Sequence, residues 1–253
     1  MSGRRYLDDL IARFEALRAN QLEPIQRAAQ YCARVIAGGG LVHLFGTGHG
    51  SIPALEAFPR TGSFVGWHPI VEPGFSPHLR VGGEGGVHQF RFLQAAEGFG
   101  RALLEAQPIH PGDAFVICSH SGVNAVIVEV ALLVQQRGLP VIAITSLEHS
   151  HHARPRHSGR RRLFEVADVV IDTGAPFGDA AVEVPGLEMR VGPVSTPLAV
   201  AALHALIAET AALLVAQGRP PLVLGHIDRE GKAVPAELRS EYISAYLTRL
   251  WKR

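Results

Sequence analysis

The sequence predicts a three-layer α/β domain, built on a doubly wound parallel sheet of about five strands with helical extensions at both ends. Short apolar runs alternate along the chain with stretches of helical periodicity, and the runs are continuous rather than alternately apolar and polar. Continuous runs are typical of strands that helices cover on both faces. The runs are LVHLF (41–45), FVGWHPIV (64–71), AFVICS (114–119), PVIAITS (140–146) and DVVIDT (168–173).

The chain begins with an amphipathic helix, because apolar residues recur at three- and four-residue steps from Leu7 to Leu17. The period continues from Ile25 to Ile36, beyond Pro24, which predicts a kink or a restart there. The glycines of AGGG (37–40) then end the helix. This helix has more apolar surface than one sheet face needs, so packing on a second subunit and packing on its own domain both stay open.

Helices are also predicted between the strands and after the last one. A helix over 197–217 has Ser195 or Thr196 as its N-cap and ends at Gly218, and a final amphipathic helix begins near Pro235. The stretches between the strands are PALEAF (53–58), HQFRFLQAAEGFGRALLEA (88–106), NAVIVEVALLVQQRG (124–138) and RRLFEVA (161–167). No linker or internal repeat divides the chain, so a single domain over residues 1–253 is expected.

Composition narrows the class of protein. Hydrophobic residues make up 47% of the 253 residues and charged residues 19%, which supplies a buried core, and the net charge of +1 gives no electrostatic case for nucleic acid. Cys32 and Cys118 lie in apolar runs and are interpreted as buried free thiols in a reducing compartment. No apolar stretch of the ~20 residues that span a membrane and no signal peptide is recognised. A cytoplasmic protein without nucleic-acid or membrane partners is expected.

Three strand ends carry glycines and hydroxyls. GTGHGS (46–51) follows the first run, but it lacks the spacing of a dinucleotide-binding loop. SHSG (119–122) leads directly into a helix, whose N–H groups and dipole suit a phosphate. GPVSTPLA (192–199) places two more hydroxyls at a helix start. Helix capping explains each loop taken alone. The three loops together favour a single site that binds a phosphate ester.

The segments HLFGTGHGS, VICSHSG, VIAITSLEHS and VGPVSTPLA together resemble the sugar isomerase (SIS) domain family, the phosphosugar-binding, flavodoxin-like fold of phosphoheptose isomerases. The resemblance covers about residues 30–220 and extends to bacterial phosphoheptose-isomerase-like proteins. It implies that Ser119, Ser121 and Thr196 bind phosphate, and that the first loop lines the sugar. The expected ligand-binding residues are Gly46, Thr47, Gly48, His49, Ser51, Ser119, His120, Ser121, Gly122, Asn124, Ser195 and Thr196.

Aldose–ketose isomerisation needs a base that moves a proton between C1 and C2 through an enediol. It also needs a general acid that opens the sugar ring or protonates the oxygen. By resemblance to the family's isomerases, the base is Glu97, in the helix before SHSG, and the acid is His204. A solvated role for Glu97 and a core role for His204 both stay open. Glu72 and Glu84 are further candidate carboxylates. His49, in the glycine loop, is better placed than His204 to touch the ligand, and His226 has weaker support.

The stretch EHSHHARPRHSGRRR (148–162) raises a zinc alternative, because neutral imidazoles bind zinc. Two histidines two positions apart need a strand or loop to converge, and carboxylate or cysteine partners are scarce. A solvated basic loop is the preferred interpretation, and contact with an anionic ligand comes next. No cofactor and no metal ligand is therefore predicted, and zinc stays open as an alternative that is not favoured. The histidines concerned are His149, His151, His152 and His157.

The resemblance implies a phosphosugar isomerase of the phosphoheptose type that acts as a homodimer. Two alternatives stay open. A non-catalytic sensor would bind the phosphosugar without turnover and report to a partner protein. An etherase would break a lactyl ether on an amino-sugar phosphate, and Glu84 would then matter beside Glu97.

Overall fold

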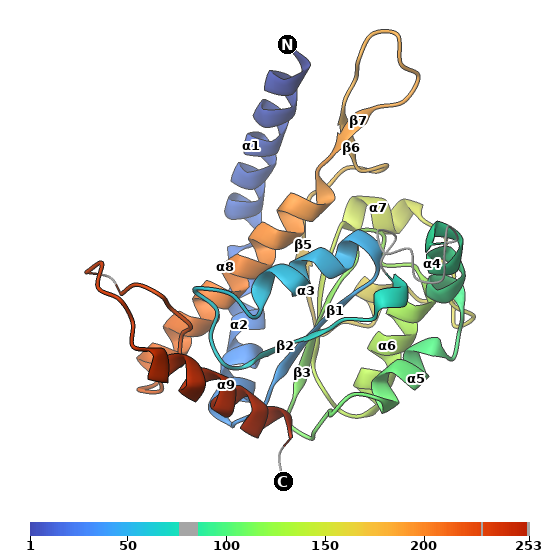
Figure 1. The fold of residues 1–253 in the computed structure, drawn as a ribbon. Helices are drawn as coiled ribbons and strands as arrows, with labels where there is room; N and C mark the ends of the chain where they lie inside the picture. The colour runs from blue at the N-terminus through green and yellow to red at the C-terminus, as the bar shows by residue number, and fades with distance from the viewer. Residues whose placement is uncertain (76–85, 229, 252–253) are drawn as a thin grey trace.

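The computed structural model describes residues 1–75, 86–228 and 230–251. In this part of the chain the centre is a sheet of five parallel strands in the order β2-β1-β3-β4-β5 (Figure 1). The order reverses direction between β1 and β3, as in doubly wound folds. The predicted α/β fold class is confirmed. The strands are β1 (Val42–Gly46), β2 (Trp67–Ile70), β3 (Ala114–Cys118), β4 (Val141–Thr145) and β5 (Val169–Asp172).

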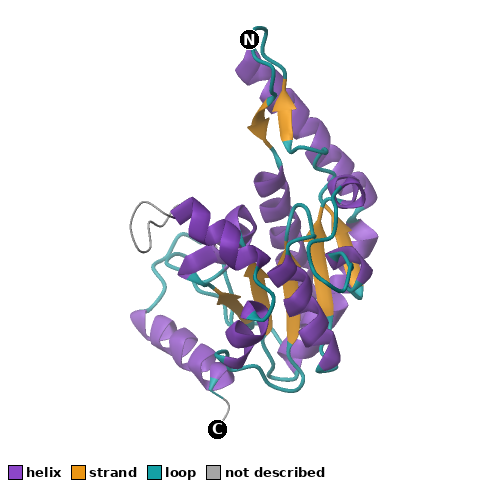
Figure 2. Ribbon diagram, turned by 90° about the vertical axis from the view of Figure 1, so that its right-hand side faces the viewer, coloured by secondary structure: helices purple, strands orange, loops and turns teal. Residues whose placement is uncertain are grey.

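Helices cover both faces of the sheet, because successive strand residues point to opposite sides. Val42 and Leu44 of β1 belong to the core on one face, whereas Phe45 belongs to the core on the other. Figure 2 shows helices on either side of the strands. The first layer contains α2 (Leu22–Ala37) and α8 (Ser195–Ala216), and the second contains α5 (Phe99–Glu105) and α6 (Ala125–Gln136).

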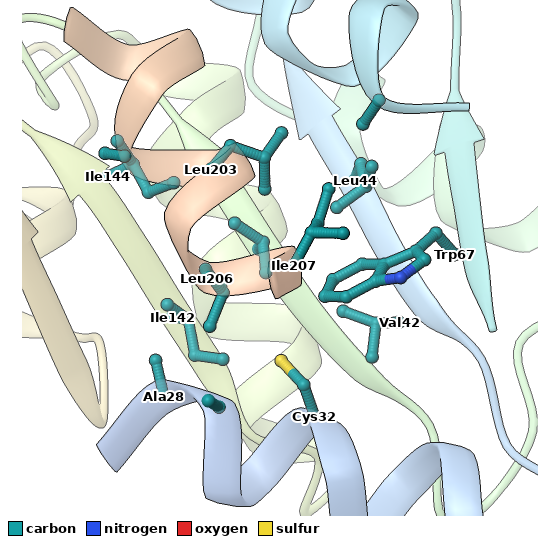
Figure 3. Packing of buried hydrophobic residues seen from close by; sticks show 14 of the residues in the cluster. Ala28, Cys32, Val42, Leu44, Trp67, Ile142, Ile144, Leu203, Leu206 and Ile207 are labelled. Atoms are coloured by element: carbon teal, nitrogen blue, oxygen red, sulfur yellow. The ribbon is translucent and has the colours of Figure 1, made fainter. Parts of the chain in front are cut away.

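Helix α8 is the central helix of the first layer. Its Leu203, Leu206 and Ile207 lie among the buried side chains over the sheet, with Trp67 and Cys32 in the same cluster (Figure 3). By length and composition α8 could cross a membrane, since an 18-residue window of it has a mean hydropathy of 2.1. His204 and Glu209 interrupt its apolar residues, so the helix is not the uninterrupted apolar stretch that the sequence analysis looked for. Here α8 packs as a core helix. Both cysteines are free and buried, as predicted.

Helix α1 (Ser2–Asn20) stops before Gln21, and α2 begins at Leu22, so Pro24 lies in the first turn of a new helix. Within α1, the one buried residue is Leu17. The helix projects from the body beside a hairpin of β6 (Ala180–Val182) and β7 (Val191–Pro193) (Figure 1). The hairpin was not predicted, because strands of three residues carry no clear apolar run.

Several helix boundaries differ from the sequence prediction. The stretch 88–106 forms two helices, because Gly98 adopts φ +92° between them. In the stretch 161–167, the helical part is a 3-10 turn, η3. Ser195 begins α8 rather than capping it, and Val194 is the N-cap. The bounds of the elements not yet given are α3 (Ile52–Ala57), α4 (Gly86–Ala95), α7 (Leu147–His152), η3 (Leu163–Glu165) and α9 (Ala236–Leu250).

Buried polar side chains lie at the amino end of the sheet. His43 of β1 donates from Nε2 to Asp113 Oδ2 at 2.9 Å, and both side chains are 0% exposed. His68 of β2 shares a hydrogen bond of 2.6 Å with the Tyr246 hydroxyl of α9. Burial, followed by the neighbouring His43, lowers the pKa of His68 to about 4. The neutral imidazole of His68 therefore joins the sheet to α9.

Candidate functional site

A pocket lies at the carboxyl end of the sheet, beside the point between β1 and β3 where the strand order reverses. Doubly wound sheets bind ligands at that point. The pocket contains about 330 Å³ of atom-free space, part of it open to solvent. The three loops singled out in the sequence therefore meet in one place. The lining residues are His49, Gly50, Cys118, Ser119, His120, Ile144, Thr173, Ser195, Thr196 and Ala199.

The first loop, residues 46–51, packs directly against the end of β3. A Cβ on Gly46 would overlap the carbonyl oxygen of Gly50 and lie 2.8 Å from that of Cys118. A Cβ on Gly50 would lie 2.6 Å from the Cys118 oxygen. Glycine is therefore required at both positions for the loop to reach the pocket wall.

The other residues of this loop have different roles. Gly48 has φ +59°, and a Cβ there would meet the ring of Phe90 in α4. The Ser51 hydroxyl donates to the Gly48 carbonyl at 2.7 Å, so it closes the loop. Thr47 is buried, and His49 lines the pocket. Of the residues predicted in this loop to line the sugar, His49 is the one that lines the pocket in the part of the chain described.

In the second loop, Ser119 and His120 line the pocket. Ser119 Oγ accepts from the Gly122 N–H at 3.1 Å, and Gly122 has φ +63°, which turns this amide back toward the serine. The Ser119 hydroxyl proton has no acceptor in the parts of the chain described. Ser119 can therefore donate to a ligand.

Ser121 and Asn124, both predicted binding residues, do not line the pocket. The carbonyl of Ser121 accepts from Ser150 Oγ at 2.7 Å. Asn124 Nδ2 donates to Gln94 Oε1 at 2.9 Å, and its Oδ1 accepts from Arg156 at 3.1 Å. The Asn124 amide therefore joins α4, α6 and the basic loop.

The third loop is held by Asp179, which was not predicted. Its carboxylate accepts from the backbone N–H of Val194 at 3.0 Å, from that of Ser195 at 2.7 Å, and from the Ser195 hydroxyl at 2.8 Å. Asp179 has φ +69°, a conformation that aspartate adopts more readily than most residues. It lies 16 residues before Ser195, and no sequence motif links the two positions. The Ser195 hydroxyl therefore donates its proton to Asp179. The Thr196 hydroxyl donates to no acceptor among the described residues.

Two imidazoles shape the electrostatics of the pocket wall. The rings of His120 and His149 lie 4.3 Å apart between centroids. Burial lowers the pKa of His120 to about 4, against an opposing effect of Asp179, and burial also lowers that of His149. Burial raises the pKa of the Cys118 thiol to about 12. These imidazoles and this thiol are therefore neutral at pH 7.

The predicted catalytic residues are not brought to the pocket. Glu97 accepts from the backbone N–H and the hydroxyl of Ser158 at 2.6 and 2.5 Å, and these bonds lower its pKa, whereas a base needs a pKa near the working pH. His204 lies eight residues after Thr196, about 12 Å along the axis of α8. Its Nε2 is 3.9 Å from Glu56 of α3. Neither side chain lines the pocket.

The weaker candidates also have other partners. Glu72 Oε1 accepts from the Gly74 N–H at 3.0 Å, within a turn. His226 Nδ1 lies 3.0 Å from a guanidinium nitrogen of Arg239 in α9. Glu84 lies outside the described residues.

The histidines of 148–162 do not converge. His149 and His152 both contact the ring of Phe177, His151 packs on Phe164, and His157 lies 3.8 Å from a Glu97 oxygen. Over residues 1–75, 86–228 and 230–251, no group of three or more His, Cys, Asp or Glu is placed to hold a metal ion.

Thr173 is a pocket residue that the sequence analysis missed. It is buried, and it directly follows β5, just as Ser119 directly follows β3. The strand-end argument that identified Ser119 could therefore have identified Thr173 too. Cys118, Ile144 and Ala199 gave no such signal, because apolar residues at these positions look like core.

Comparisons with known proteins agree with this architecture. The family model of the SIS domain matches residues 5–146. A UPF0309 protein of Brucella anthropi is 37% identical over 233 residues, covering 89% of this chain and 93% of the relative. A UPF0309 protein of Oceanobacillus iheyensis is 37% identical over 204 residues, covering 81% of each chain.

Solved structures share the fold. Phosphoheptose isomerase GmhA from Neisseria gonorrhoeae has a TM-score of 0.52 at 14% identity, covering 81% of this chain and 95% of that one. A phosphoheptose isomerase from Francisella tularensis has a TM-score of 0.50 at 14% identity, covering 81% of this chain and 94% of that one. At these identities the likeness concerns the fold.

Proposed function

The chain belongs to the SIS domain family, and from this premise we propose that it binds a phosphosugar in the pocket at the carboxyl end of its sheet. The observation that carries the proposal is the meeting of Ser119 and Thr196 in one pocket at the start of α8. Hydroxyl donors and a helix N-terminus suit a phosphate group. Ser195 supports them through its bond to Asp179, rather than donating to the ligand.

Binding of a phosphosugar should depend on the two hydroxyls. Ser119→Ala and Thr196→Ala are each expected to weaken binding by about tenfold or more, because a hydrogen bond to a charged group contributes ~1.5–3 kcal/mol. Isothermal titration calorimetry with sedoheptulose, glucosamine and N-acetylmuramic acid phosphates measures this. Ser240→Ala, exposed on α9, is the matched control and should bind as the wild type does. Unchanged affinity in both pocket variants would reject the site.

The reaction proposed for this pocket is aldose–ketose isomerisation, supported by the shared fold of phosphoheptose isomerases. Among the described lining residues, the imidazoles of His49 and His120 are the candidates for proton transfer to or from the sugar. A second candidate, binding without turnover, is favoured by the positions of Glu97 and His204 away from the pocket. Product analysis after incubation with the three sugar phosphates separates the two functions. Binding without any product would refute the isomerase and support the sensor.

A second copy of the chain is the proposed partner. In the 18-residue apolar window of α8, 39% of the window is buried. On α1, the side chains of Leu7 and Ile11 are 57% and 56% exposed. An isolated helix of 19 residues is marginally stable in water, so the projecting α1 needs further cover. A two-fold pair would cover the same face of both copies.

The double variant Leu7→Glu/Ile11→Glu is expected to shift the protein from dimer to monomer, because it places carboxylates in the shared apolar face. Sedimentation velocity at about 10 µM protein measures the shift. Phe92→Glu, an equally apolar exposed residue on α4, should leave the dimer intact. A wild-type protein that sediments as a monomer would refute the proposed pair.

A further inference from the structure

His120 has two ring nitrogens without a hydrogen-bond partner in the described parts of the chain, although both atoms are buried. A buried polar atom without a partner costs folding free energy, so such atoms call for a functional explanation. The residue lines the pocket beside Ser119. A ligand in the pocket would supply the missing partner.

The part of the pocket lining that the structure describes carries no permanent positive charge. None of its described lining residues is a lysine or an arginine. Hydroxyls and backbone amides stabilise a phosphate dianion through dipoles alone, whereas an imidazolium would add a full charge. His49 and His120 are the lining side chains that can acquire one, and His120 is the one whose ring nitrogens lack partners.

The groups that face His120 leave it neutral but ready to gain a proton. Asp179, from the turn before β6, favours the charged form. On α7, His149 opposes the charged form and Glu148 favours it. Burial has a larger effect than any of these, and it keeps the ring neutral. A dianion at hydrogen-bond distance would oppose burial directly, since an opposite charge within 4–6 Å moves a pKa by about 1–3 units.

We propose that His120 takes up one proton from solvent when the phosphate group of the ligand binds, so that its imidazolium pairs with the phosphate. One ring N–H bond forms, and no bond in the ligand breaks. The inference rests on the proposed function, because it requires a phosphate in this pocket. Affinity for the dianion should rise as the pH falls from 8 toward 6, since the bound form holds one more proton than the free form.

Inorganic sulfate is the sharpest probe, because it stays a dianion from pH 5 to 8, whereas a phosphate ester titrates near pH ~6. Calorimetry at about pH 6 in two buffers of different ionisation enthalpy counts the protons taken up. Imidazole C–H resonances, assigned with His120→Gln, follow the titration of His120 in the wild-type protein. The midpoint of His120 should rise by about two pH units or more with sulfate, from about 4 to near 6. Uptake of several tenths of a proton should accompany binding.

His120→Gln should abolish proton uptake and weaken sulfate binding. His151→Gln is the matched control, because His151 packs on Phe164 away from the pocket, and it should change neither quantity. Sulfate binding that depends on Ser119 and Thr196 but leaves the His120 midpoint unmoved would overturn this inference and keep the proposed function. Absence of sulfate binding, or binding indifferent to Ser119→Ala and Thr196→Ala, would overturn both. If His120→Gln does not fold, the calorimetric proton count on the wild-type protein decides, because it needs no assignment.

Discussion

Replacing Gly46 with alanine is expected to destabilise the protein and to abolish ligand binding in the pocket. The new Cβ would overlap the carbonyl oxygen of Gly50 and approach that of Cys118 to 2.8 Å, and both obstacles are backbone atoms that cannot rotate away. Overpacking of this kind costs about 3 kcal/mol or more. The loss corresponds to a fall in Tm of roughly 6–12 °C for a chain of this size. Thermal unfolding and calorimetry with a sugar phosphate measure the two effects.

Gly3→Ala is the matched control for Gly46→Ala. Gly3 lies in α1, and a Cβ there would meet no atom within 4 Å. Alanine is the better helix former, so this variant should be as stable as the wild type or slightly more stable. A Gly46→Ala protein with wild-type Tm and wild-type ligand affinity would contradict the packing of the first loop against β3.

Replacing Asp113 with alanine should have the largest effect at the other end of the sheet. The carboxylate accepts from His43 Nε2, from the Leu41 N–H at 2.9 Å and from the His110 N–H at 2.8 Å. Removing one partner of a buried charged network costs about 3–5 kcal/mol, because the remaining donors stay buried without an acceptor. Chemical denaturation at pH 7 measures the loss in the free energy of unfolding.

The stability that Asp113 supplies should also depend on pH. Burial alone would raise the pKa of this carboxyl, but the hydrogen bonds from His43 and the two amides prevail and lower it. A carboxyl whose pKa is lowered by folding stabilises the protein above its unfolded value of about 4 and loses that contribution as the pH falls further. The gap between wild type and Asp113→Ala should therefore narrow below pH ~4. Asp8→Ala, exposed on α1, is the control and should change stability by less than about 0.5 kcal/mol at any pH. A similar small change in Asp113→Ala would show that the buried network contributes little.

The sheet could be predicted from the sequence because its signal is local. Each of the five parallel strands coincides with a continuous apolar run, and β3 and β4 match their runs to within a residue at either end. Helix α7 was missed, since its histidines give no apolar period and its N-cap, Ser146, belongs to the preceding strand run. The long stretch over 88–106 was predicted as one helix because apolar periodicity continues across Gly98, where the backbone turns away.

Part of the pocket lining could be predicted from the sequence, because parallel strands carry their carboxyl ends to one edge. That geometry brings the loops after β1 and β3, with His49, Ser119 and His120, to the same edge, whereas Thr196 follows the separate hairpin strand β7 and is placed by the packing of α8 and the bonds of Asp179. Which side chains among neighbours line the pocket depends on local hydrogen bonds that no spacing reveals. Ser51, for example, closes its own loop. Glu97 was assigned through resemblance alone, and its bonds to Ser158 are long-range contacts that only the folded chain defines.

The buried polar contacts at the amino end of the sheet and the hydroxyl-lined pocket at the carboxyl end share no residue. The strands separate them, so a substitution in one set leaves the hydrogen bonds of the other unbroken. Mutations that change ligand preference can therefore accumulate at the side chains that line the pocket, outside the packed glycines of the first loop, while the far end preserves the fold. This separation makes the scaffold evolvable. Protein engineers can change the side chains that line the pocket without changing the buried hydrogen bonds at the other end of the sheet.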